Sequence, residues 1–134
     1  MKMREGELIA EESVSKYVNL EVRTREFAKS VRKIVKKLKK DISNIEDCKQ
    51  VVRSSGSIGA NYIEANENFS KADFAYRIHI CRKEAKETCY WLEILKDNNI
   101  PDYQPDFENL IEEGLAIQRL FGAIHQKVNP IKHT

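Results

Sequence analysis

One segment of the sequence combines small residues with polar side chains that could do chemistry: residues 54–67, SSGSIGANYIEANE. In and just before it, polar residues recur every three or four positions: Gln50, Arg53, Ser57, Asn61 and Glu64. On a helix this spacing confines them to an arc of about 80°, where side chains are neighbours. Such a face can be a solvated surface, a polar contact between subunits or a ligand site, and the residues alone leave all three open.

Two glycines in this segment, Gly56 and Gly59, raise the question of a phosphate-binding loop. That loop needs glycine-rich backbone leading into the N-terminus of a helix. Here the expected helix begins well before them, because Ser43 and Glu46 have the spacing of a capping box. A glycine inside a helix costs roughly 1 kcal/mol relative to alanine. We therefore expect the small residues to permit close packing against a neighbouring helix.

The residues most often used for metal binding or nucleophilic catalysis are scattered: Cys48, Cys81, Cys89, His79, His125 and His133. There is no CxxC pair, and no histidine follows a glutamate by three positions, as it does in di-iron bundles. A seam position for Cys81 favours a buried, reduced thiol over a catalytic one. We expect no metal, no cofactor and no catalytic residue, and hence a protein that is not an enzyme.

Apolar residues at alternating three- and four-residue steps predict four helices, at about residues 17–40, 44–68, 71–97 and 105–128. Cap signals stand near the starts of the last three: Ser43 with Glu46, Ser70, and Pro105. The sequence thus predicts an all-α protein with one domain over residues 1–134, folded as an antiparallel up-down-up-down four-helix bundle. Residues 1–12 are expected to be frayed.

The third expected helix has a second apolar flank besides the one that faces its own bundle. This flank contains Tyr76, Ile80, Trp91 and Ile94. A second apolar surface usually marks an interface, and tyrosine, tryptophan and arginine are favoured interface anchors. We expect a homo-oligomer whose subunit contacts use the second and third helices.

The net charge of +2 conceals an uneven distribution along the chain. Residues 16–40 contain ten Lys or Arg and two acids, a local charge of +8, whereas residues 97–113 contain six acids and no base. The basic residues expected on the outer face of the first helix are Lys29, Arg32, Lys33, Lys36, Lys37 and Lys40. They are candidates for binding RNA or DNA phosphates, although a lysine-rich face can also be merely solvated. The acidic segment is a candidate docking site for another protein.

The polar residues also carry a family resemblance. Arg53, Ser57, Asn61 and Glu64, followed by Glu87 ahead of Trp91, resemble the motif of a bacterial four-helix bundle family. That family includes the proteins encoded by intervening sequences of 23S ribosomal RNA genes, also labelled S23 ribosomal protein-like. The resemblance covers about residues 17–128. It implies assembly into a ring, commonly a pentamer, and attaches no catalytic role to the motif residues.

The accessory variability protein of diversity-generating retroelements is similar at a greater distance, and it is a basic pentameric barrel that binds nucleic acid and a reverse transcriptase. The present sequence departs from the common family pattern at two places. Tyr62-Ile63 replaces a small Ile-Ala pair, and Ala65 replaces a glycine. We therefore expect the second helix to continue to about Asn68.

Two functions from different classes remain open. One is an oligomeric scaffold that binds RNA or DNA through the basic first helix, and the other is a structural or protein-interaction scaffold without a nucleic-acid role. No apolar run approaches the roughly 20 residues that cross a bilayer, and the first twelve residues lack the apolar middle of a signal peptide. We expect a cytoplasmic protein with no membrane contact.

Overall fold

The computed structural model describes residues 19–67 and 70–128, which form four α-helices and no strand. The helices are α2 (Leu20–Val35), α3 (Ile42–Glu67), α4 (Lys71–Asp97) and α5 (Gln104–Val128). A 3-10 turn, η1 (Pro101–Tyr103), precedes α5. The predicted all-α class with four helices is confirmed.

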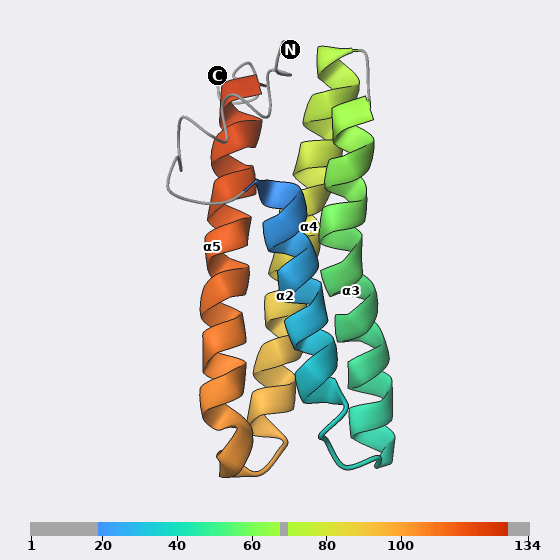
Figure 1. Cartoon of the computed structure of the whole chain (residues 1–134), viewed down its shortest axis with the longest axis vertical. Helices are drawn as coiled ribbons and strands as arrows, with labels where there is room; N and C mark the ends of the chain where they lie inside the picture. Colours follow the sequence, from blue (N-terminus) through green and yellow to red (C-terminus); the bar gives the residue numbers. More distant parts are fainter. Residues whose placement is uncertain (1–18, 68–69, 129–134) are drawn as a thin grey trace.

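Figure 1 shows the helices side by side, with α2 and α4 each packed between α3 and α5. The connection from α2 to α3 and the connection from α4 to α5 lie at the same end of the molecule (Figure 1). Since α2 and α4 occupy opposite positions between the same two helices, the groove between α2 and α3 faces away from the groove between α4 and α5.

On α2, α4 and α5 the core contains the apolar residues whose three- and four-residue spacing predicted the helices, whereas on α3 it contains Val51, Ile58 and Ala65, and the predicted Ile45 is exposed. The largest side chains with less than 2% exposure include Phe107, Phe121, Ile58, Ile78 and Leu92. Burying a side chain of this size contributes roughly 1.5–3 kcal/mol. Tyr62 also lies in this core, with its ring 5.5 Å from that of Phe121 in an edge-to-face arrangement.

The start of α3 differs from the prediction. The helix begins at Ile42, and the side chain of Asp41 accepts hydrogen bonds from the Asn44 N–H (2.9 Å) and the Ser43 hydroxyl (3.2 Å). The predicted capping box of Ser43 and Glu46 is therefore wrong. Asp41, two residues before Ser43, caps the helix by accepting the Asn44 N–H, so Ser43 and Glu46 lie inside the helix.

The other two predicted helix starts agree better with the structure. Ser70 caps α4 as predicted, since its hydroxyl accepts the Asp73 N–H at 3.0 Å. Pro105 is the second residue of α5, within the first turn, where the missing N–H of proline costs nothing.

The first described helix ends sooner than predicted. Asn19 caps α2 by accepting the Val22 N–H, and the helix ends at Val35 rather than near Lys40. A short turn follows, in which the Leu38 N–H donates to the Val35 carbonyl and the Leu38 side chain is buried. Lysines three and four residues apart repel one another in a helix, so the turn is favoured here. Residues 1–18 and 68, including the predicted frayed segment and the predicted helix ends at 17 and 68, lie outside the described residues.

The small residues of α3 permit close helix packing, as predicted. A Cβ atom added to Gly59 would lie 2.7 Å from Oγ1 of Thr24, a residue of α2 that is 1% exposed. One turn earlier, Gly56 leaves room for the guanidinium of Arg32, which a Cβ atom would approach to 3.1 Å. On the α4 side, the buried hydroxyls of Ser54 and Thr88 are 2.8 Å apart.

Candidate functional site

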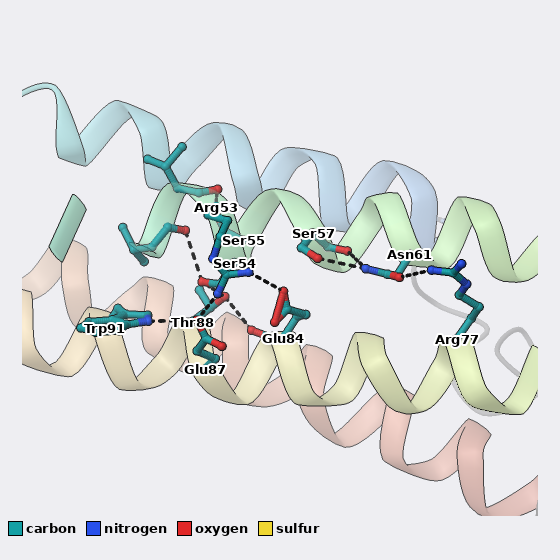
Figure 2. A network of polar contacts seen from close by, with 12 residues as sticks. Arg53, Ser54, Ser55, Ser57, Asn61, Arg77, Glu84, Glu87, Thr88 and Trp91 are labelled. Atoms are coloured by element: carbon teal, nitrogen blue, oxygen red, sulfur yellow. Dashed lines mark hydrogen bonds and ion pairs between the residues drawn. The ribbon is translucent and has the colours of Figure 1, made fainter. Parts of the chain in front are cut away.

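The motif residue Arg53 is part of an ion-pair cluster that joins α3 to α4 (Figure 2). Its Nη1 donates to Glu84 Oε2 at 3.0 Å, and its Nη2 donates to the Glu87 carboxylate. The same carboxylate accepts the indole N–H of Trp91 at 3.2 Å. The sequence did not show whether Arg53 pairs with Glu64 or with Glu87. In the structure, Arg53 pairs with Glu87 and with Glu84. Exposed ion pairs contribute roughly 1 kcal/mol or less, so we infer that the cluster mainly sets the alignment of the two helices.

Two other motif residues form a second polar contact between α3 and α4. The side-chain amide of Asn61 donates to both the carbonyl and the hydroxyl of Ser57, each at 2.9 Å. Its Oδ1 accepts Arg77 Nη1 at 2.9 Å, as Figure 2 shows. Because the Ser57 contacts fix the orientation of the amide, Asn61 presents an oxygen to Arg77. Glu64 is exposed, and it forms no hydrogen bond or ion pair with Ser57, Asn61 or Arg77.

The sequence did not identify Arg77 and Glu84 as members of the site. Both lie on α4, whereas the motif was recognised by its spacing along α3. Both clusters pair cations with carboxylates or amides, and neither pairs a nucleophile with a base. Their geometry therefore suits helix joining better than catalysis.

The predicted interface residues of α4 lie on the outside of the bundle or at its edge. We call these four predicted residues, Tyr76, Ile80, Trp91 and Ile94, together with Tyr90, which the sequence had not singled out, the outer row. Tyr76 and Tyr90 are 63% and 60% exposed, and the other three are half-buried. The rings of Tyr90 and Trp91 are 5.0 Å apart and edge-to-face. The use of this row for subunit contacts stays a prediction.

The basic residues separate into two groups. We call Lys33, Lys36, Lys37 and Lys40 the lysine cluster; all four are exposed, at the end of α2 and in the connection to α3. Lys29 is exposed but is 3.1 Å from Glu26. Arg32 is half-buried and donates to the carbonyls of Ala28 and, across the helix interface, Val52. Arg32 thus packs α2 against α3, whereas the sequence placed it on the outer face.

Comparison with known proteins identifies the family of this chain. The family model described as 23S rRNA-intervening sequence protein matches residues 19–123. The chain belongs to this family. The match covers α2, α3, α4 and most of α5, including every residue of both polar clusters, and it confirms the resemblance seen in the motif.

A crystal structure of a similar protein supports the same assignment. It is a protein of unknown function from the S23 ribosomal protein family of Bacteroides thetaiotaomicron, with 33% sequence identity and a TM-score of 0.65. The alignment covers 75% of the present chain and 93% of that protein. No functionally curated protein matches the chain.

In this member of the family, the cysteines are poorly suited to nucleophilic chemistry. Burial raises the pKa of Cys89 to about 11, and it also raises the pKa values of Cys81 and Cys48. Since the thiolate is the nucleophile, little of it forms near neutral pH. In the described part of the chain, no three His, Cys, Asp or Glu residues come together as a metal site, and no helix is long and apolar enough to span a membrane.

The stability of this family member should fall as the pH rises above about 9. An unfolded cysteine ionises near its ordinary pKa of about 8.5, whereas folded Cys89 keeps its proton to about pH 11. Between these values the folded state binds more protons, so this stabilisation is complete below the unfolded pKa and declines above it. Urea unfolding at pH 7.5, 9 and 10 should show a steeper fall for the wild type than for Cys89→Ala. Parallel curves would contradict this expectation.

Proposed function

We propose that this chain is a non-enzymatic, cytoplasmic up-down-up-down bundle that assembles with copies of itself into a ring and binds RNA or DNA. The lysine cluster would contact the phosphates. By resemblance, the ring is a pentamer. A ring multiplies the lysine cluster by the number of subunits, so a nearly neutral chain can still present a strongly basic surface.

The observation that carries this proposal is the exposure of the lysine cluster, whose members form no ion pair among the described residues. Asp106 borders the same hollow as Lys33 and Lys37 without pairing with either. Lys33, Lys36, Lys37 and Lys40 make no ion pair among the described residues, whereas Lys29, Lys49 and Lys96 each lie within 3.3 Å of a glutamate. Mutual repulsion among unpaired lysines decreases when phosphates neutralise them. Binding then releases counterions and depends strongly on salt.

The chemistry of the cluster favours the nucleic-acid backbone over the bases. Ammonium groups on flexible stems bind phosphate as point charges. Base recognition on single strands needs aromatic stacking platforms, and the exposed tyrosines Tyr76 and Tyr90 lie on α4 rather than beside the cluster. Tyr103 does lie beside it, but this tyrosine is half-buried, and its hydroxyl donates to the Lys37 carbonyl at 3.2 Å. We therefore expect binding that depends little on nucleotide sequence.

The direct test replaces Lys33, Lys36 and Lys37 with glutamate and measures binding of a fluorescent single-stranded RNA by anisotropy. The variant should bind at least tenfold more weakly at 50 mM salt. If four phosphates are contacted, wild-type affinity should fall roughly 50-fold between 50 and 200 mM salt, since each contact on a single strand contributes about 0.7 to the slope of log K against log salt.

A matched control reverses the same number of positive charges at other positions. Glutamate at Arg25, Lys86 and Lys127, all exposed and outside the lysine cluster, alters the net charge equally. This control should bind RNA within about twofold of the wild type. Equal losses in the two triple variants would show that only net charge matters, and no binding by the wild type to RNA or DNA at low salt would refute the proposal.

A protein-interaction scaffold is the second candidate, and the exposed tyrosines of the outer row favour it. The acidic residues 97–113 could also dock a basic protein. Affinity capture from the native cell, with and without nuclease, separates the two functions. A captured protein that survives nuclease supports the scaffold, whereas capture that nuclease abolishes supports nucleic-acid binding.

A further inference from the structure

A groove between α2 and α3 combines an apolar floor with a basic rim, and we call it the lysine-rimmed groove. Its volume is about 380 Å³, within the usual range of binding pockets. The residues that matter here are Leu38, Ile45 and Val52 on the floor and Lys39, Lys40 and Lys49 on the rim. Ile45 is 44% exposed, so the floor remains open to solvent.

A second surface, on α5, has the opposite character, and we call it the acidic ridge. It consists of Glu108, Glu112 and Leu115, whose spacing of four and three residues places them on one helical face. Leu115 is 41% exposed. Neither glutamate makes an ion pair among the described residues, and like charges four residues apart destabilise a helix. A cationic partner would relieve this repulsion.

The two surfaces cannot meet within one molecule. The groove lies between α2 and α3, and the ridge borders the hollow between α4 and α5. That hollow is also lined by Glu93, by Lys96, which pairs with Glu93 at 3.3 Å, and by Ile111 and Arg119. In Figure 1, these two helix pairs face opposite sides of the bundle, with α2 in front and α4 behind. Contact between the surfaces therefore requires two copies of the chain.

We propose that the acidic ridge of one copy docks into the lysine-rimmed groove of the next. Leu115 would enter the apolar floor, and Glu108 and Glu112 would meet Lys39 and Lys40. Lys49, which also pairs with Glu46 at 3.2 Å, would lie beside them. This inference rests on the self-assembly in the proposed function and names the surfaces that produce it. Because the two surfaces differ, the contact is heterologous, and such contacts generate closed rings when the rotation between copies closes.

Charge and shape together favour a second copy over nucleic acid as the occupant. The floor of the groove is aliphatic, which a phosphate backbone cannot use. The ridge supplies both an exposed leucine and two unpaired carboxylates. Every chain carries one groove and one ridge, so docking leaves neither uncovered in a closed ring.

The test reverses each surface separately and then both together. Lys39→Glu with Lys49→Glu should reduce the mass in light scattering to one chain, 15.6 kDa, and so should Glu108→Lys with Glu112→Lys. An equimolar mixture of these two variants should associate into species larger than one chain, because each contact then joins one variant to the other. Since the variants must alternate, a ring with an odd number of subunits cannot close in this mixture, and only the increase in mass is the readout. The chain that carries all four substitutions should also assemble. Circular dichroism checks that each variant remains helical, and the lysine cluster residues Lys33, Lys36 and Lys37 remain unchanged throughout.

The possible outcomes separate this inference from the proposed assembly. If the wild type is an oligomer and the single-surface variants keep its mass, this contact is wrong while self-assembly stands. If reversal dissociates the protein but neither the mixture nor the combined variant reassociates, the groove and ridge do not contact each other. If the wild type itself has the mass of one chain at micromolar concentration, both proposals fail.

Discussion

Gly59→Leu is expected to lower the free energy of unfolding by about 3 kcal/mol. The first added atom would already lie 2.7 Å from Thr24 Oγ1 and 4.0 Å from the Thr24 carbonyl carbon. Thr24 is buried, and its hydroxyl donates to the Leu20 carbonyl at 2.7 Å, so it cannot turn away without losing that bond. The helices must then separate, and overpacking of this kind typically costs about 1–3 kcal/mol or more. Urea unfolding followed by circular dichroism measures the change.

Gly122 offers a matched control for the same substitution in α5. A Cβ atom there would meet only Arg82 Cδ, at an ordinary 3.5 Å. Leucine has better helix propensity than glycine by roughly 0.5–1 kcal/mol, so Gly122→Leu should leave stability unchanged or slightly raised. Equal destabilisation by both variants would contradict the claim that Gly59 is the point of close helix approach.

Asn66→Leu is expected to stabilise the bundle by about 2 kcal/mol. Asn66 is 2% exposed, and neither its Nδ2 nor its Oδ1 has a hydrogen-bond partner among the described residues. Leaving such groups buried and unpaired costs about 1–3 kcal/mol. Leucine has a similar volume and removes the desolvated amide while keeping the site filled. The midpoint of urea unfolding should rise without a change in slope.

Asn44 provides the comparison, because it is equally buried but fully bonded. Its Nδ2 donates to the Lys39 carbonyl at 2.8 Å and to Asn99 Oδ1 at 2.9 Å, and its Oδ1 accepts from Asn99 at 3.0 Å. Asn44→Leu should therefore destabilise the protein by about 2 kcal/mol, since it removes these three hydrogen bonds and takes the donor away from the Lys39 carbonyl and from Asn99 Oδ1. If both leucine variants destabilise alike, the contrast between an unpaired and a paired amide is refuted.

The predictable part of the fold depends on patterns within single segments. The three- and four-residue spacing of apolar residues predicts the helices. A predicted helix start agrees with the structure where only one residue nearby can cap the helix, as at Ser70. The prediction fails near Ser43, because Asp41 competes for the same role. It also fails after Val35, where repulsion between lysines and burial of Leu38 end α2 early.

The polar site was predictable only in part, for a related reason. Spacing along α3 identified Arg53, Ser57 and Asn61 as neighbours. Their partners Glu84 and Arg77 depend on how α4 is rotated against α3, and that rotation follows from core packing rather than from any local motif. The position of Arg32 could not be predicted for the same reason. Its hydrogen-bond partner across the interface is the Val52 carbonyl of α3, which the guanidinium reaches beside Gly56.

The polar clusters and the proposed docking surfaces thus have separate tasks. The Arg53 and Asn61 clusters align α3 with α4 inside one chain. The lysine-rimmed groove and the acidic ridge lie on other sides of the bundle and stay available to neighbouring copies. Lys33, Lys36 and Lys37 of the lysine cluster, which lie outside the groove, then remain for nucleic acid.

The most direct test of the account is sedimentation velocity of the wild-type protein mixed with a fluorescent single-stranded RNA at 50 mM salt. We predict that the RNA label and the protein sediment together as one discrete species with several chains of 15.6 kDa each. Free RNA beside a protein of single-chain mass would contradict both the assembly and the binding.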